Sequence, residues 1–278
     1  ALPQVEGRIV SNTVPVQVYL PLLSPIPLNP AFASTPLVRL LSQWTPVAAP
    51  DAGADMGERL AQWVSAFDAI SLHTAHRAIQ AMGPSSAWVP AAGRRPVPPA
   101  ALAKDFAQVR DQQARAIAQA PTLPNEFSYA PYKRRHLELQ RQMGLAVDAL
   151  RQRVRDALAL YGPGLHQLAA LDAAMDKVVS PREQALLPVA VTVLERRFGQ
   201  LQAAHLKALN DARQALPEDS DMPDTAAQDD PMLWRRPGAW LHCFEQDWHQ
   251  ALCAELDLRL EPVAGLIEAT GIELNHSL

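Results

Sequence analysis

The sequence predicts an all-α protein, a bundle of about seven helices in which several long helices run antiparallel. Apolar residues recur three and four residues apart over most of the chain, which is the period of a helix with one buried face. The 25 prolines and 12 glycines gather mainly between these periodic stretches, where they end or begin helices. With 48% apolar residues in 278, the chain is long enough to bury a sizeable core.

The first third of the chain predicts an extended segment followed by two helices. Residues 1–33 are rich in proline and lack a helical period, so we expect them to be extended or disordered. We expect residues 34–275 to form a single helical domain. Thr35 can cap its first helix, and Pro36 suits the first turn. A second helix is expected from Asp55 to about Met82.

The middle of the chain predicts two amphipathic helices, at about 99–120 and 128–161. The second of them has an apolar stripe in heptad spacing, four and three residues apart by turns. Its central members are Met143, Val147, Leu150 and Val154. Such a stripe predicts a coiled-coil-like pair, and the second helix of that pair lies either in the same bundle or in a partner protein.

The last 115 or so residues predict a turn, two more helices, an acidic linker and a C-terminal helix. A capping box at Ser180–Glu183 predicts the start of a long helix to about residue 216, with a kink or break at Pro188. Residues 217–232 hold six acidic residues and no Lys or Arg, which predicts a flexible linker. The final helix is expected to start near residue 237, to bend at Pro262 and to end near residue 270.

Composition and patterning argue for a cytoplasmic protein without membrane insertion. Cys243 and Cys253 are too far apart on one helix to bridge each other, so we expect free thiols. Prolines interrupt both apolar runs, at 14–28 and 185–194, and the second is about half the ~20 residues of a membrane span. We find no signal-peptide pattern at the start of the sequence.

No motif in the sequence predicts a catalytic site or a cofactor. A phosphate-binding glycine loop, a nucleophile elbow and a zinc-protease motif are all missing from it. His249 and Cys253 are four residues apart and form a weak candidate metal site, because one helix supplies only two ligands. Asp172 and Asp176 have the same spacing, which suits acid–base chemistry but is more typical of a solvated helix face. We therefore expect a non-enzymatic protein and keep a metal-dependent helical enzyme as an alternative.

The strongest charge feature is a basic stretch at the start of the helix at 128–161. Lys133, Arg134, Arg135 and Arg141 lie close together there, just after two tyrosines. A nucleic-acid contact through the helix at 133–155 is a second alternative. Because the whole chain carries a net charge of −4, a solvated face or pairing with the acidic linker explains the stretch better.

Several motifs, in order along the chain, resemble an uncharacterised proteobacterial family known as domain of unknown function 3348. They are STPLVRLL at 34–41, ERLAQW at 58–63, YAPY at 129–132, LERRF at 194–198 and AELDLRLEPV at 254–263. The resemblance covers about residues 31–270. It implies no activity, cofactor or catalytic residue. It suggests a cytoplasmic accessory of an envelope machine, because genes of this family neighbour those of MotA/TolQ/ExbB-like proton channels and OmpA-like proteins.

These observations favour a non-enzymatic interaction protein that docks on another protein, or on a second copy of itself, through helical surfaces. The heptad stripe motivates this hypothesis, although burial of the stripe inside the bundle explains its spacing equally well.

Overall fold

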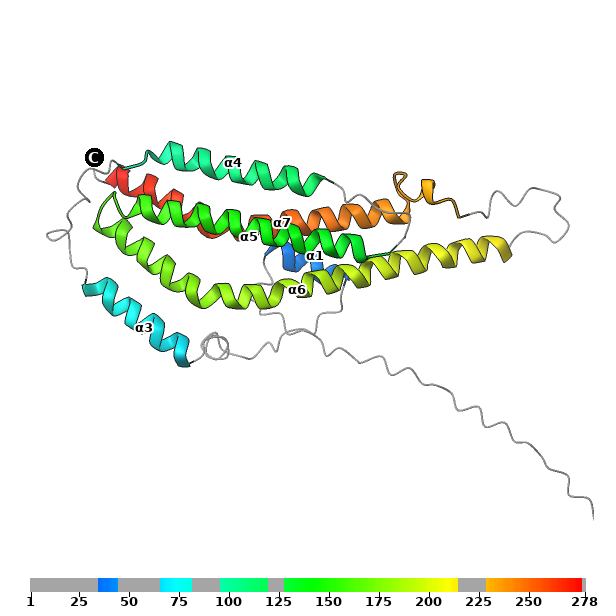
Figure 1. Cartoon of the computed structure of the whole chain (residues 1–278), viewed down its shortest axis with the longest axis horizontal. Coiled ribbons are helices and arrows are strands. Elements are labelled where there is room, and N and C mark those ends of the chain that lie inside the picture. Colours follow the sequence, from blue (N-terminus) through cyan, green and yellow to red (C-terminus); the bar gives the residue numbers. More distant parts are fainter. Residues whose placement is uncertain (1–34, 45–65, 82–95, 120–127, 215–228, 277–278) are drawn as a thin grey trace, which may run out of the picture.

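A computed structural model confirms the predicted all-α fold (Figure 1). The structure describes residues 35–44, 66–81, 96–119, 128–214 and 229–276. Within these ranges it has six α-helices, one short 3-10 helix and no strand. Their bounds are α1 Pro36–Trp44, α3 Ala66–Ala81, α4 Pro99–Ala118, α5 Ala130–Leu158, α6 Pro163–Gln214, η2 Pro231–Leu233 and α7 Trp240–His276.

The long helix α5 lies between α4, α6 and α7, and contacts all three of them. It runs antiparallel to α6, because Arg151 bonds Asp172 near one end while Gln140 bonds the Leu187 carbonyl further along. It runs parallel to α7, which the sequence analysis did not predict. Tyr132 bonds Glu245, and Gln140 bonds Glu255 about two turns later on α5 and nearly three turns later on α7.

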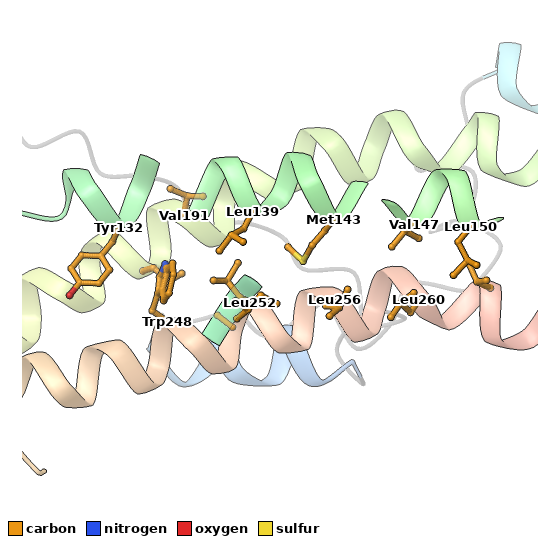
Figure 2. Close-up of a cluster of buried hydrophobic side chains, with 14 of the residues drawn as sticks. Tyr132, Leu139, Met143, Val147, Leu150, Val191, Trp248, Leu252, Leu256 and Leu260 are labelled. Atoms are coloured by element: carbon orange, nitrogen blue, oxygen red, sulfur yellow. The ribbon is translucent and has the colours of Figure 1, made fainter. Parts of the chain in front are cut away.

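The apolar stripe of α5 is the centre of the core (Figure 2). Leu139, Met143 and Leu150 are fully buried and face a matching stripe of leucines on α7. That stripe consists of Leu252, Leu256 and Leu260, spaced four residues apart. The two stripes pack along the length of both helices because each repeats at the helical period.

Aromatic side chains fill the other end of the core, where α5 and α7 begin. Phe198 of α6 packs edge-on against Phe244 and Trp240, with ring centroids 5.0 and 5.3 Å apart. Tyr132 lies edge-on to Phe244 at 5.0 Å and donates a 2.6 Å hydrogen bond to Glu245. Burial, followed by this contact with Glu245, raises the pKa of the Tyr132 hydroxyl well above its usual value, so the phenol stays protonated.

The predicted helix start at Ser180 is wrong, because α6 is one helix of 52 residues that contains Pro181 and Pro188. Ser180 does not cap a helix, since its hydroxyl donates to Asp176 instead at 2.6 Å. Both proline rings are exposed, whereas Val178 and Ala190 on either side are buried. Each proline removes one backbone hydrogen bond, and packing on both sides holds the helix together. The result is a bend rather than a break, which Figure 1 shows as the curve of α6.

The C-terminal helix α7 also continues past its proline, Pro262, and reaches His276 rather than residue 270. The described end of the acidic segment is held against α6, because Asp229 accepts a hydrogen bond from the Trp234 indole and contacts His205 of α6. Three predicted segments lie outside the described residues. They are the extended segment at 1–33, the first part of the second expected helix at 55–65, and residues 217–228 of the acidic segment.

None of the helices in the described ranges combines the length and the hydropathy that a bilayer span requires.

The position of the heptad stripe leads to a test with two leucines of α5. Leu150 has none of its surface exposed, whereas Leu145 is 61% exposed. We expect Leu150→Ala to lower the free energy of unfolding by about 2–5 kcal/mol, because it leaves a cavity in the core. Leu145→Ala, the matched control, changes it by less than about 0.5 kcal/mol. Urea unfolding followed by circular dichroism measures both, and equal effects would place the stripe outside the core.

Candidate functional site

A second, polar stripe runs along α5 beside the apolar one. His136, Gln140 and Gly144 are spaced by four residues, and Arg151 and Arg155 continue the same face two turns later. Polar residues of α6 and α7 meet this stripe in the interior. We call the whole set the charged seam: His136, Gln140, Arg151 and Arg155 of α5, Asp172, Asp176 and Glu183 of α6, and Glu255 and Arg259 of α7.

Glu255 is the most deeply buried acid of the charged seam, with 1% of its side chain exposed. Its Oε1 accepts hydrogen bonds from Nε and Nη2 of Arg259, at 3.0 and 2.8 Å. Its Oε2 accepts one from Nε2 of Gln140 at 2.9 Å and lies 3.5 Å from Nε2 of His136. Both carboxylate oxygens therefore have partners, and these partners come from two helices.

These partners keep Glu255 ionised in the interior. Burial by itself raises the pKa of a carboxyl group, because the charged form loses its hydration. Here the neighbouring His136 ring, the Arg259 charge and the Gln140 amide outweigh burial, and the pKa of Glu255 lies below its usual value. A buried carboxylate of this kind is tolerated only while its partners stay in place.

His136 is the buried base next to this carboxylate, and none of its side-chain surface is exposed. Neither ring nitrogen has a hydrogen-bond partner within the described part of the chain. The ring lies edge-on to Trp248, with centroids 6.3 Å apart. The 3.5 Å approach to Glu255 is thus its only polar contact there, and it is an ion-pair contact if the ring is protonated.

The other end of the charged seam is a four-residue ion cluster between α5 and α6. Arg151 binds Asp176 at 2.8 Å, and Arg155 binds Asp172 and Asp176 at 2.6 and 2.8 Å. Burial raises the pKa of Asp176, but the Ser180 hydroxyl and both arginines outweigh it and lower the pKa below its usual value. The aspartates expected on a solvated face are instead the partners of two arginines from the basic helix.

Glu183 of α6 also belongs to the charged seam. Its environment raises the pKa of its carboxyl group, whereas the pKa values of Glu255 and Asp176 are lowered. Burial raises the pKa of Glu183, and the Asp176 and Asp148 charges add to the effect. The charges of Arg259 and Arg151 counteract burial only in part, so the pKa stays above its usual value. The charged seam therefore contains two glutamates whose ionisation is favoured in one case and disfavoured in the other.

The structure buries the residues that we proposed for docking on a partner. Met143, Val147, Leu150 and Val154 all lie in the core, with exposures of 0 to 5%. Burial of the stripe within the bundle was the alternative reading of its spacing. A partner of this fold would have to use another surface.

The weak metal candidates lie side by side on α7, where Sγ of Cys253 is 3.7 Å from Nδ1 of His249. Burial, followed by the charge of Asp257, raises the pKa of the Cys253 thiol. Within the ranges that the structure covers, no cluster of three or more His, Cys, Asp or Glu side chains is placed to hold a metal ion.

Three of the four proposed nucleic-acid contacts have partners within the chain. Lys133 lies 3.7 Å from Glu195, and Arg135 donates to the Ala116 carbonyl at 2.9 Å. Arg141 lies 3.3 Å from Glu138 on its own helix. Arg134 is exposed. The positive charge of this stretch is thus partly balanced by nearby carboxylates.

One sequence pattern, the spacing of polar residues on α5, indicates the charged seam. The spacing from His136 to Arg155 follows one helix face, as the apolar stripe does. The residues that this face meets, however, are 17 to 119 positions away in the sequence, from the Arg155–Asp172 pair to the His136–Glu255 pair. Only the packing of three helices brings them together.

We expect Glu255→Gln to lower the free energy of unfolding by about 3 kcal/mol at pH 7. The reason is that it removes the carboxylate that lies between His136 and Arg259. The pKa of Glu255 is lowered in the fold, so its stabilisation is present above the usual glutamate pKa and is lost as the pH falls through the lowered value. The difference in the free energy of unfolding between wild type and Glu255→Gln should therefore become smaller as the pH falls. Urea unfolding at pH 7 and at about pH 3 measures it.

Glu138→Gln is the control for this experiment, because Glu138 is a partly exposed glutamate that pairs with Arg141 on the surface of α5. We expect its unfolding midpoint to match that of wild type. If the difference in the free energy of unfolding between wild type and Glu255→Gln is the same at pH 7 and at about pH 3, Glu255 is not ionised in the fold.

Glu183→Gln should behave in the opposite way. Because the fold raises the pKa of Glu183, ionised Glu183 lowers the stability of the fold at pH values above that raised pKa. This loss of stability disappears below the usual glutamate pKa, where the side chain is protonated in both the folded and the unfolded chain. We expect the variant to be slightly more stable than wild type at pH 7, by less than about 1 kcal/mol for a partly exposed side chain. The same urea series measures it, and a clear loss of stability at pH 7 would show that Glu183 is held as a carboxylate.

Comparison with known proteins gives a family and no relative of known activity. The family model described as "Protein of unknown function (DUF3348)" matches residues 25–272. No curated protein and no solved structure matches the chain. Because the match covers nearly all of the described helices, the chain belongs to the family of proteins of unknown function DUF3348.

Proposed function

We propose that this chain is a non-enzymatic helical interaction protein that docks on another protein through the outer face of α3. The observation that carries the proposal is the exposure of two large apolar side chains one turn apart on that helix. Phe67 is 83% exposed and Ile70 is 63% exposed. Adjacent exposed apolar residues of this size are typical of surfaces that bind a partner.

The packing of α3 supports this choice. Among the described elements α3 contacts α6 alone. Its inner face, with Leu72 and Ile79 half-buried, lies against α6, and no described side chain of α3 is fully buried. Figure 1 shows α3 along the first half of α6, away from α4. The outer face is therefore free of the other helices in the described part of the chain.

The charges of α3 indicate the kind of partner that fits. The outer face carries Arg77 and two exposed histidines, His73 and His76. The one acid of α3, Asp68, is bound to Arg182 of α6. An apolar surface with a basic rim fits a partner that presents apolar side chains flanked by carboxylates.

The family resemblance suggests where to look for the partner. It points to a cytoplasmic accessory role beside a membrane component of the MotA/TolQ/ExbB-like class. The ion pairs of Lys133 and Arg141, and the hydrogen bond from Arg135 to the Ala116 carbonyl, make the nucleic-acid alternative weaker.

Crosslinking and affinity capture of the full chain from its native cells test the proposal. We expect the double variant Phe67→Ser/Ile70→Ser to capture at least tenfold less of the partner than wild type does. The reason is that the central apolar contacts of an interface dominate its affinity. The control is Leu206→Ser/Met232→Ser, which removes two exposed apolar side chains of α6 and η2. Mass spectrometry compares both with wild type, and circular dichroism checks that all three are folded.

Three outcomes decide the proposal. Proteins that are captured by wild type and by the control, but lost by the α3 variant, support it, as does a further loss on Arg77→Glu. Equal capture by all three chains would contradict docking through α3. Capture that disappears after nuclease treatment would contradict protein docking and favour nucleic acid.

A further inference from the structure

The side of α6 that lies under α3 is one continuous helix face, which we call the α3 seat. Its members are spaced by four, four, three and four positions: Gln167, Leu171, Met175, Val178 and Arg182. Both ends of the seat bind α3. Gln167 donates a hydrogen bond to the Ile79 carbonyl at 3.4 Å, and Arg182 pairs with Asp68. Helix α3 therefore lies antiparallel to α6 along the seat (Figure 1).

Helix α3 covers its seat only in part. Leu171 and Met175 remain 43% and 41% exposed with α3 in place. On the inner face of α3, the residues toward α6 are all half-buried: Asp68, Leu72, Ala75 and Ile79. Among the described elements, α6 is the only one that α3 contacts. A helix with so few buried apolar contacts is among the first parts of a fold to open.

The contacts that hold this part of α6 in the bundle do not involve α3. Asp172 and Asp176, on another side of the same stretch, are bound by two arginines of α5. Ala169 is buried in the core that α5, α6 and α7 share. Departure of α3 would also uncover little new apolar surface, because two of the three apolar side chains of the seat are already partly exposed. The bundle can therefore stay folded while α3 leaves.

We propose that the α3 seat is a helix-docking surface, from which α3 is released as a unit and on which an amphipathic helix of a partner protein takes its place. Helix α3 itself shows the chemistry of this occupant, because its inner face presents one carboxylate and then apolar side chains at helical spacing. The partner helix carries an acidic residue that pairs with Arg182, and its apolar stripe lies on Leu171 and Met175. This inference does not rest on docking through the outer face of α3.

Hydrogen exchange of the full chain at pH 7, followed by mass spectrometry, tests the release of α3. We expect amides of α3 to exchange at least tenfold faster than those of α5, because α3 opens without the bundle. The inner-face variant Asp68→Ala/Leu72→Ser should raise the α3 rate at least tenfold more and leave α5 unchanged.

The matched control is the outer-face variant Phe67→Ser/Ile70→Ser, which should leave both exchange rates unchanged. The same variant removes the contacts proposed for docking on the outer face. A failure of that docking and a failure of α3 release are therefore distinguishable, since exchange is measured without any partner.

A fluorescent synthetic peptide with the sequence of residues 66–81 is the probe for the vacated seat. We expect it to bind the Asp68→Ala/Leu72→Ser chain at least tenfold more tightly than wild type, whose tethered α3 competes for the seat. A peptide with Asp68→Lys should bind this chain more weakly. Adding Arg182→Glu to the chain should restore the binding of that peptide, because the charge pair forms again with its signs exchanged. Fluorescence anisotropy measures each affinity.

Several results would overturn the proposal. Exchange of α3 as slow as that of α5 would show that α3 leaves only when the bundle unfolds. Absence of peptide binding to the folded inner-face variant, equal affinity for that variant and wild type, or no rescue by the charge exchange would contradict a seat for an acidic amphipathic helix. If the inner-face variant does not fold, excess peptide must accelerate exchange of α3 in ¹⁵N-labelled wild type, and an unchanged rate would overturn the proposal.

Discussion

The contact on which the rest of the structure depends is the one between Glu255 and its three partners in the interior. An ionised carboxylate that loses water needs hydrogen bonds and opposite charge, and Glu255 obtains them from Gln140 and His136 of α5 and from Arg259 of its own helix. Sliding α5 by one turn along α7 would take Gln140 and His136 away from that charge and leave it with Arg259 of its own helix alone, whereas the leucine stripes would still find apolar neighbours. The apolar stripes therefore supply most of the favourable burial, and we infer that the polar contacts select one register of the two helices.

The same reasoning explains why prolines do not break the bundle. Pro181, Pro188 and Pro262 each remove a backbone hydrogen bond, and each ring faces solvent. Side chains on the opposite faces of α6 and α7 are buried in the core or bound in the charged seam. Glu183 and Arg259, for example, lie within one turn of Pro181 and Pro262. Tertiary contacts thus hold together helices that local propensity alone would have divided.

Two features of the structure stand out, one on the outer face of α3 and one in the interior. The outer face of α3 is proposed as a docking surface because Phe67 and Ile70 expose apolar area without cover from the other described helices. The charged seam lies inside the bundle, where its ion pairs and hydrogen bonds join α5 to α6 and to α7. Membership of the DUF3348 family agrees with the resemblance found in the sequence and assigns a role to neither feature.

The sequence by itself determined the helical class, because a 3.6-residue period needs only neighbouring residues to be seen. It also determined most helix bounds, such as those of α1 and α4, where proline and a following apolar period stand together. The heptad stripe of α5 was visible for the same reason, although its spacing does not distinguish a core from an interface.

Only the tertiary structure decided what those helices do to one another. The parallel course of α5 and α7, the continuity of α6 through Ser180, and the pairing of Arg151 and Arg155 with Asp172 and Asp176 all depend on contacts between distant segments. A charged residue has the same sequence signature on a solvated face and in a buried ion pair. Its role is fixed by the helix that packs against it, and no local pattern encodes that helix.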